Sequence, residues 1–284
     1  MLSKEYLKYL FHSKRYLLLF IALISLLNQI GNRQHLKWAL TFEAFLCLLL
    51  TFVMPCLVFY HVHDRKAADT YFSLPVSRDK LLTSGILFAF LVSYLPLAFS
   101  LIVYGISEKT FLWIVICLFE TMIGVFAQNV FNLSLYMIGN NFTDGIIMIG
   151  AYTFMPVVVY GVIQAFYFGF VAGINYFEFE KIRFISPLFL NGSLIASFMD
   201  NEETLSLTFL CLLIYAVLFF FISLRNYRKR PCEKIGMRSD GFLSYPFVIT
   251  AYAILCLFII SMQFDYDYTD LSAFFRDSFI EYLL

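Results

Sequence analysis

The chain has 284 residues, of which 61% are apolar and 14% are charged, and its formal net charge is zero. A soluble domain of this length cannot bury so much apolar surface, so its solvent must be lipid, and the balanced charge gives no reason to expect a nucleic-acid partner. The predicted fold class is therefore all-α, a polytopic membrane protein with about six to seven transmembrane helices and an N-terminal interfacial elbow helix. Five of the six cysteines lie inside apolar runs, which is typical of small core residues and not of a disulfide or metal framework.

The first 15 residues predict an amphipathic helix. At about 100° per residue, Lys4, Lys8 and Arg15 fall on one arc with Glu5 and His12, and most apolar side chains fall on the other. We expect this elbow helix, residues 1–15, to lie in the membrane interface and to lead into the first span. Two interpretations stay open, a general basic anchor or an interfacial helix that contacts a partner protein.

Seven apolar segments approach or exceed the roughly 20 residues that a membrane-spanning helix needs. They lie at 16–31, 38–60, 81–106, 111–139, 145–173, 205–224 and 242–262. The transmembrane domain is thus predicted over 16–262, and the connections that matter most are the loops at 61–80, 174–204 and 225–241. The turn predicted between the fourth and fifth spans is Gly139-Asn-Asn-Phe-Thr-Asp-Gly145.

Basic residues indicate the orientation of these spans, because Lys and Arg favour the cytoplasmic side. With the N-terminus inside, fourteen of the 20 Lys and Arg residues fall on the cytoplasmic side and six outside. The loops at 61–80 and 225–241 are then cytoplasmic. The segment 174–204 and the acidic tail at 263–284 are extracellular, and seven spans place the C-terminus outside.

The loop at 61–80 contains more aromatic and charged residues than a simple turn requires. An aromatic pair, Tyr71 and Phe72, stands between charges of both signs, and Leu74 is biased toward extended geometry because it precedes Pro75. We expect a short helix through Asp64–Phe72, a kink at Ser73-Leu74, and a new helix from Pro75 into the third span. The aromatic pair and Leu74 then form an apolar centre, as in protein interfaces, within a polar rim of Arg65, Lys66, Asp69, Arg78 and Asp79. The alternative is an ordinary cytoplasmic loop with snorkelling aromatic side chains.

The run Ala67-Ala-Asp-Thr-Tyr-Phe-Ser-Leu-Pro-Val-Ser-Arg-Asp-Lys-Leu81 resembles the loop after the second span in ABC-2 type permeases, the membrane subunits of bacterial ATP-binding-cassette exporters. The N-terminal segment resembles the elbow helix of that family, and Ile185-Ser-Pro-Leu-Phe189 resembles a recurrent Ser-Pro site before the sixth span. The run Arg228-Lys-Arg-Pro-Cys-Glu-Lys-Ile-Gly236 resembles a stretch in a Gram-positive subgroup, which includes permeases linked to acetoin utilisation and to peptide or antibiotic export. The seventh span departs from the six of the plain family pattern.

The resemblance implies a location and partners. The chain would be a multi-pass protein of the bacterial plasma membrane, embedded in the lipid bilayer. It would bind a separate ATP-binding-cassette ATPase subunit and a second permease chain, either an identical copy or a related paralogue. The residues that would couple it to the ATPase are Arg65, Asp69, Tyr71, Phe72, Leu74, Pro75 and Arg78.

The sequence lacks motifs for nucleotide binding and catalysis. It contains no Gly-x-x-x-x-Gly-Lys-Ser/Thr phosphate loop, and no cytoplasmic segment is long enough for a nucleotide-binding domain. We therefore expect no cofactor and no enzymatic activity in this chain, with ATP and Mg on the partner subunit. His61 and His63 diverge on a helix, so polar interfacial side chains are favoured there over a metal site.

Glu120 lies inside the fourth predicted span, where an ionisable side chain is costly. It is expected to line a translocation path or a subunit contact, or else to pair with a neighbour such as Asn129. The leading function is the permease subunit of an ABC exporter that moves an amphipathic or hydrophobic substrate, such as a peptide, an antibiotic or a lipid-like molecule. A stand-alone secondary transporter is the alternative, and an intramembrane enzyme is disfavoured because the spans lack paired catalytic residues.

Overall fold

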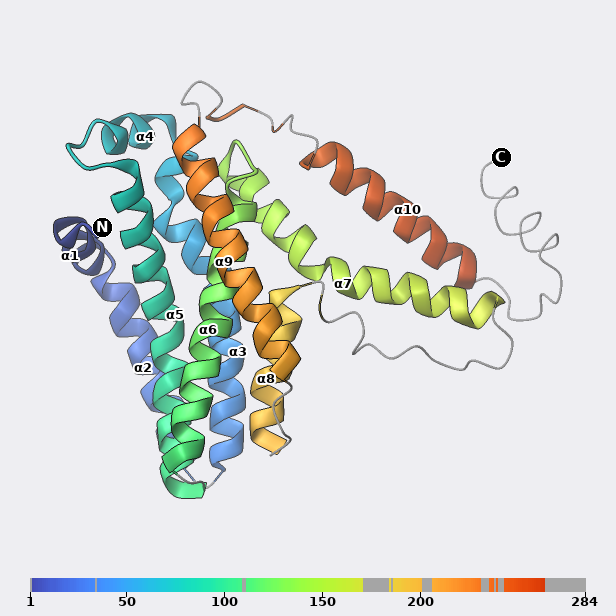
Figure 1. Cartoon of the computed structure of the whole chain (residues 1–284), viewed down its shortest axis with the longest axis horizontal. Coiled ribbons are helices and arrows are strands. Elements are labelled where there is room, and N and C mark those ends of the chain that lie inside the picture. The colour runs from blue at the N-terminus through green and yellow to red at the C-terminus, as the bar shows by residue number, and fades with distance from the viewer. Residues whose placement is uncertain are drawn as a thin grey trace. The chain divides into compact units, whose positions relative to one another are not determined.

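The computed structural model describes residues 2–33, 35–108, 111–170, 184, 186–200, 206–230, 235–237, 239 and 243–263. Every regular element in this part of the chain is a helix, which confirms the predicted all-α fold class (Figure 1). The chain divides into two compact units, residues 1–150 with 187–239, and residues 151–186 with 240–284. The acidic tail predicted at 263–284 lies, apart from Gln263, outside the described residues.

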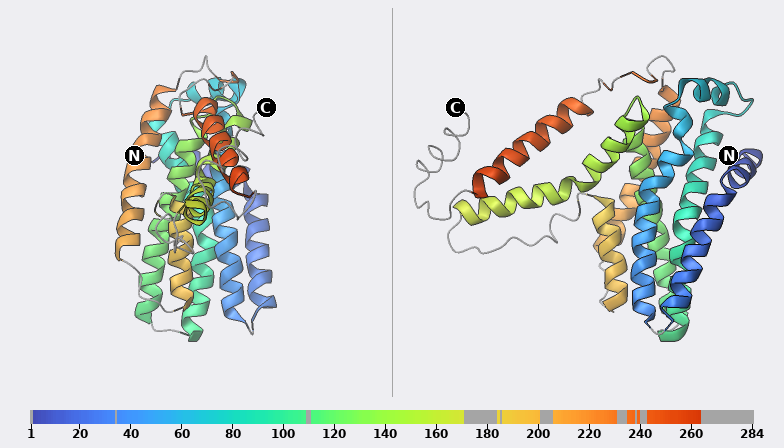
Figure 2. Two further views of the ribbon diagram at one scale, coloured as in Figure 1. Left: turned by 90° about the vertical axis from the view of Figure 1, so that its right-hand side faces the viewer. Right: turned by 180° about the vertical axis from the view of Figure 1, so that it is seen from behind.

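The first unit is a bundle of helices in which α3 packs against α5, and α6 packs against α9 (Figures 1 and 2). Its long helices are α2 (Arg15–Gly31), α3 (Leu36–Val58), α5 (Arg78–Glu108), α6 (Phe111–Tyr136) and α9 (Ser206–Lys229). Its other elements are α1 (Lys4–Ser13), the 3-10 helix η1 (Tyr60–Val62), α4 (Arg65–Phe72), the beginning of α7 (Phe142–Phe170) and α8 (Pro187–Asp200).

Five of the described helices are long and apolar enough to cross a membrane, namely α3, α5, α6, α7 and α9. Helices α1 and α2 pass the same test as a pair bent by 66°, which makes a sixth span if the pair counts as one. The chain is therefore a polytopic, multi-pass membrane protein. The seventh predicted span corresponds to α10 (Tyr245–Gln263), whose described apolar stretch, Tyr245–Leu257, is shorter than a full span.

The predicted elbow forms because α1 is capped at one end and joined to α2 through a bend at the other. The hydroxyl of Ser3 accepts a hydrogen bond from the backbone N–H of Tyr6 at 3.3 Å, which is a typical N-cap contact. Tyr6 and Leu10 are buried on the inner face of α1. Lys14 stands between the two helices, and the chain turns there into α2.

Close packing of α3 and α5 depends on Gly85. A Cβ atom at this position would lie 2.6 Å from Cζ of Phe59, so a larger residue would displace that ring. Pro55 lies inside α3, and Pro96 lies inside α5. Prolines are tolerated in membrane helices, because neighbouring helices and local adjustments satisfy the backbone groups that they free.

Part of the loop predicted at 174–204 is the helix α8, which the sequence analysis did not predict. Pro187 is its first residue, the position where the missing N–H of proline costs least. Leu190, Leu194 and Ile195 are buried, and α8 packs against α6 and α9. Residues 174–183 and 201–204 of this predicted loop lie outside the described residues.

The second unit contains the remainder of α7 together with α10. The hydroxyl of Tyr152 donates to the carbonyl of Leu243 at 2.6 Å, and the Tyr152 ring stacks on Phe247 with centroids 6.2 Å apart. The hydroxyl of Tyr252 in α10 donates to the carbonyl of Ala151 in α7. These three contacts hold α10 against α7.

Candidate functional site

The chemically distinctive side chains of the first unit gather at the end of the bundle where α4 lies. We call this cluster the polar junction and define it as His61, His63, Tyr71, Phe72, Tyr136, Tyr227 and Arg230. It brings together η1, α4, the last residue of α6 and the end of α9. Members that contact each other are up to 167 residues apart in the chain, so tertiary packing creates it.

Asp64 starts α4 as the sequence predicts. Its carboxylate accepts hydrogen bonds from the backbone N–H groups of Lys66 at 3.0 Å and Ala67 at 3.5 Å. Ala68, on the inner face of this helix, is fully buried, and the helix ends at Phe72. A capped helix of defined length therefore stands in the middle of the loop.

Pro75 was expected to begin the next helix, but α5 begins at Arg78. The backbone N–H of Val76 donates to the carbonyl of Leu74 at 2.7 Å, so the chain makes a tight turn at the proline. The first helical hydrogen bonds of α5 run to the carbonyl of Ser77. Serine is strongly preferred just before a helix, and this preference decides the boundary in place of the proline.

The predicted aromatic pair packs largely inside the chain. The Tyr71 ring stacks on His61 with centroids 4.2 Å apart and meets the ring of Tyr6 edge-on at 6.1 Å. Phe72 lies edge-on to Tyr227 with centroids 5.8 Å apart. The two rings thus anchor α4 to η1, α1 and α9, and only part of their surface is open to a partner.

Arg78 and Asp79, two residues of the predicted rim, contact the end of α9. The Arg78 guanidinium lies 4.3 Å from the ring centroid of Phe72, and its Nη1 donates to the carbonyl of Arg228 at 3.1 Å. Asp79 accepts two hydrogen bonds of 2.6 Å from the Arg228 side chain. Both partners of this ion pair are well exposed, so we expect it to contribute little to the stability of the fold.

Arg230 is the central residue of the polar junction, and only 8% of it is exposed. Its Nη1 donates to the carbonyl of Met137 at 2.8 Å, and its Nη2 donates to the carbonyl of Gly139 at 2.8 Å. Nη2 also lies 3.0 Å from Nδ1 of His63. The two carbonyls follow the last turn of α6, where a cation stabilises the negative end of the helix dipole.

His61 and His63 point in different directions, as their spacing predicts. Nε2 of His61 lies 3.1 Å from the hydroxyl of Tyr227, and Nε2 of His63 lies 3.1 Å from the carbonyl oxygen of Tyr136. The second contact requires a proton on Nε2 of His63, which leaves its Nδ1 to accept from Arg230. Burial lowers the pKa of His61 to about 4, and burial together with the Arg230 charge lowers the pKa of His63 to about 3. Both rings are neutral near pH 7.

The turn between α6 and α7 fits against His63 because residue 145 is glycine. A Cβ atom at Gly145 would lie 2.6 Å from the Tyr136 ring and 3.0 Å from Nε2 of His63. A Cβ atom at Gly139 would collide with the backbone of Gly145. A turn between α6 and α7 is present as predicted, but it ends earlier, because α7 begins at Phe142 and Gly145 already lies in its first turn. Both glycines are required by close approach.

The outward face of α4 and of the turn that follows is mostly polar. We call it the α4 surface and define it by its exposed residues Arg65, Lys66, Asp69, Thr70, Leu74 and Pro75. Leu74, in the turn after α4, is its largest apolar residue, with 40% of its surface exposed. The predicted rim is thus present in part, since its first three members are exposed and Arg78 and Asp79 turn to α9.

Some residues of the elbow contact the bundle, and others are exposed to solvent. The backbone N–H of Ser3 donates to the hydroxyl of Ser84 at 2.9 Å, which fixes the start of α1 to α5. Arg15 donates to the hydroxyl of Tyr16 at 2.9 Å, and its guanidinium lies 4.8 Å from the same ring. The remaining basic elbow residues predicted to matter, Lys4 and Lys8, are exposed.

Glu120 lies half-buried in α6, and a row of buried amides follows it along the same helix. Nε2 of Gln128 donates to Oδ1 of Asn132 at 3.3 Å, and Nδ2 of Asn132 donates to a carbonyl of α3 at 2.9 Å. Nδ2 of Asn129 donates to the carbonyl of Val125 at 2.9 Å. From the sequence, Asn129 was considered only as a partner of Glu120, and the row of buried amides was not predicted.

The helix α4 was predicted from the sequence, but Arg230 and Tyr227, which hold this end of the bundle, were not. Arg230 belongs to a run of basic residues at the end of α9, and nothing in that run distinguishes the buried arginine from its exposed neighbours. The local signal that was available is the pair His61 and His63 directly after a span. Across the described ranges, no group of three or more His, Cys, Asp or Glu side chains is arranged to hold a metal ion. Comparisons of the chain with protein-family models, curated proteins and solved structures give no match.

Proposed function

We propose that this chain is the membrane-spanning subunit of an ABC exporter of the ABC-2 type, driven by ATP that a separate subunit hydrolyses. The observation that carries the proposal is the α4 surface, on which charged and apolar side chains point outward from a helix that aromatic contacts fix to the bundle. A loop that only joins two spans needs neither the Asp64 cap nor the internal anchors. In the proposed orientation, the N-terminus and α4 face the cytoplasm of a bacterial cell.

The contacts of the polar junction connect α4 directly to other elements of the bundle. Tyr71 contacts η1 and α1, and Phe72 and Arg78 contact the end of α9. His63 contacts Arg230, which in turn holds the α6–α7 turn. Because packed interiors shift between discrete arrangements, a movement of α4 during the ATPase cycle would move these elements together.

Polar groups along α6 support a translocation role for that helix. Among the described residues, Oε1 of Gln128, Oδ1 of Asn129 and the whole amide of Asn191 have no hydrogen-bond partner although they are buried. Such groups are costly in a membrane bundle and mark routes for polar parts of a substrate. We propose that these amides and Glu120 contact an amphipathic or hydrophobic cargo, such as a peptide, an antibiotic or a lipid-like molecule.

A stand-alone secondary transporter is the second candidate, and one observation favours it. Glu43 is fully buried in α3, where its Oε1 accepts a hydrogen bond from Nδ2 of Asn28 in α2 at 3.2 Å. Buried intramembrane carboxylates couple proton or ion movement to transport in that class. A protein of this kind works without an ATPase subunit.

The test combines copurification with reconstitution of the full-length chain. We expect the chain purified from its native membrane to carry an ATP-binding-cassette ATPase, and the chain alone in liposomes to show no nucleotide-dependent transport. The double variant Arg65→Glu with Lys66→Glu, and separately Leu74→Asp, should lower the recovered ATPase about tenfold or more, because a few central contacts carry most of the binding energy. Their thermal unfolding should match that of the parent chain.

The matched control is the double variant Arg33→Glu with Lys37→Glu, which makes the same charge change at exposed positions where α2 joins α3. It should leave the ATPase bound. Gradient-driven transport by the chain alone, abolished by Glu43→Gln, would replace the proposal with the secondary transporter.

A further inference from the structure

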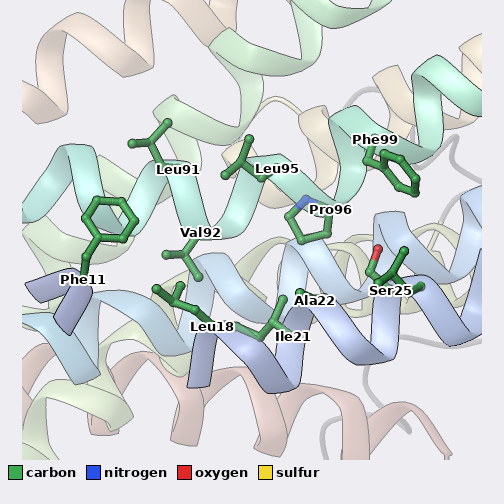
Figure 3. Close-up of a pocket in the computed structure, with 11 residues that line it drawn as sticks. Phe11, Leu18, Ile21, Ala22, Ser25, Leu91, Val92, Leu95, Pro96 and Phe99 are labelled. Atoms are coloured by element: carbon green, nitrogen blue, oxygen red, sulfur yellow. The ribbon is translucent and has the colours of Figure 1, made fainter. Parts of the chain in front are cut away.

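A groove runs along the outside of the bundle between the elbow and α5. It has a volume of about 430 Å³, within the range of ligand sites, and Ser25 is the one polar residue in its lining. The ring of Phe11 in α1 lies at one end (Figure 3). The walls come from α2 and α5 and include Leu18, Ala22, Leu91 and Leu95.

The groove opens toward the bilayer and not into the core of the bundle. Leu95 on one wall is 57% exposed, and Leu26 on the other is 50% exposed. The lining residues of α5 extend from 91 to 99 and those of α2 from 18 to 26, which is about 12 Å of helix in each case. Half of the hydrocarbon core of a bilayer is about 15 Å. An acyl chain that enters from the interface therefore fits along the groove within one leaflet.

Basic side chains stand at the Phe11 end of the groove. Arg15, the first residue of α2, lies about one helical turn before Leu18, and Lys14 stands at the bend that joins α2 to α1. Lys8 is exposed on α1, and residues 2–15 contain a single carboxylate, Glu5. The mouth of the groove is therefore cationic, whereas its depth is apolar.

We propose that this groove binds one acyl chain of an anionic phospholipid from the surrounding leaflet, and that Lys8, Lys14 and Arg15 hold the phosphate of its headgroup. A bilayer lipid is the occupant that matches both the depth of the apolar walls and the charge at the mouth. The bound chain fills the space between the elbow and α5. The 66° bend between α1 and α2 then depends on lipid, as does the position of Tyr6 against Tyr71.

The experiment uses the full-length chain in nanodiscs with a trace of phosphatidylglycerol that carries a photoactivatable diazirine in its acyl chain. Mass spectrometry should place the label on groove residues, at least fivefold more strongly than with the same probe on phosphatidylcholine. The variant Lys14→Gln with Arg15→Gln should lower labelling by phosphatidylglycerol at least about fivefold, toward the level of phosphatidylcholine, and leave labelling by phosphatidylcholine unchanged. Ala22→Trp, which fills the groove, should abolish labelling by both probes.

The matched control is the lipid-facing side of α9 around Ile214 and Val217, which also ends in a basic residue, Arg225, but has no second wall. Arg225→Gln should leave the labelling of the groove unchanged. Equal labelling by the two headgroups, or labelling of α9 as strong as that of the groove, would overturn the proposal. If Ala22→Trp does not fold, the variant Lys14→Gln with Arg15→Gln still tests lipid binding, because its substitutions lie outside the packed walls of the groove.

Discussion

Arg230 shows how much of this end of the bundle depends on one side chain. It is buried, and its guanidinium donates to the carbonyls of Met137 and Gly139 and contacts His63. Met137 and Gly139 lie in the turn between α6 and α7, and His63 follows η1, so Arg230 joins these two segments to the end of α9. A buried charge is retained here because hydrogen-bond acceptors and a helix C-terminus surround it.

We predict that Arg230→Met destabilises the chain by about 3 kcal/mol or more, since hydrogen bonds to a charged group contribute about 1.5–3 kcal/mol each and their acceptors would stay buried. The measurement is thermal unfolding in detergent, followed by tryptophan fluorescence. Lys229→Met removes an exposed charge next to it and should change the midpoint little. A midpoint for Arg230→Met equal to that of the parent chain would refute the role assigned to this arginine.

The two buried histidines predict acid sensitivity. The pKa of each is lowered by burial, to about 4 for His61 and about 3 for His63, whereas in the unfolded chain both titrate near 6.5. Between these values the unfolded state binds more protons, so their contribution to stability is complete above about pH 6.5 and falls as the pH drops. The loss is about 1.4 kcal/mol per pH unit for each histidine.

The test compares unfolding midpoints at pH 7.5 and pH 5. The double variant His61→Gln with His63→Gln should show a clearly smaller fall between these two conditions than the parent chain. His12→Gln, at an exposed position of α1, should reproduce the fall of the parent. An undiminished fall in the double variant would assign the acid sensitivity to other groups.

At the scale of elements, α4 has an inner side that anchors it and an outer side that is free to bind. Tyr71 and Phe72 face His61, Tyr6 and Tyr227. Leu74 and the charged residues of the α4 surface make none of these ring contacts. The two sides can therefore be separated by mutation, which a simple connecting loop would not allow.

We predict that Tyr71→Ala with Phe72→Ala lowers stability by about 3 kcal/mol or more, because removing large packed rings leaves cavities. Leu74→Asp should cost less than about 0.5 kcal/mol in the isolated chain, since its side chain is exposed. Thermal unfolding in detergent distinguishes the two variants. Equal midpoints for both would mean that the aromatic pair does not hold α4 in place.

The sequence predicted the elements better than their contacts. The spans could be found because each is a long apolar run, and α4 could be found because it lies in a polar loop between two such runs and a proline follows it. The start of α5 was misplaced, since the serine before Arg78 outweighs the proline. The helix α8 was missed because it is short and packs against α6 and α9, and the polar junction was missed because its partners lie up to 167 residues apart. Local patterns fix local structure, and only packing decides which of several basic residues is buried.

At the scale of the whole molecule, α6 has two contrasting halves. Its second half, from Ala127 to Tyr136, is buried and carries the amides, whereas the apolar side of its first half is exposed at Leu112, Val115, Phe119 and Met122. Glu120 is half-buried in this first half. A second permease chain packed on the apolar side would remove Glu120 from lipid and place the two α6 helices next to each other, which is the arrangement that the proposed exporter requires.

We therefore predict that α6 lies at a contact between two permease chains, identical or related. With Cys211, Cys232 and Cys256 replaced by serine, the variant Phe119→Cys should form a disulfide-linked species of two permease chains when membranes are oxidised. Phe221→Cys, on an exposed side of α9, is the matched control and should stay a single chain, because the two positions are similarly exposed and differ in the helix that carries them. If variants with cysteine at 115, 119 or 122 all stay single chains, a contact through α6 is ruled out. A cross-link with cysteine at 221 alone would place that contact on α9.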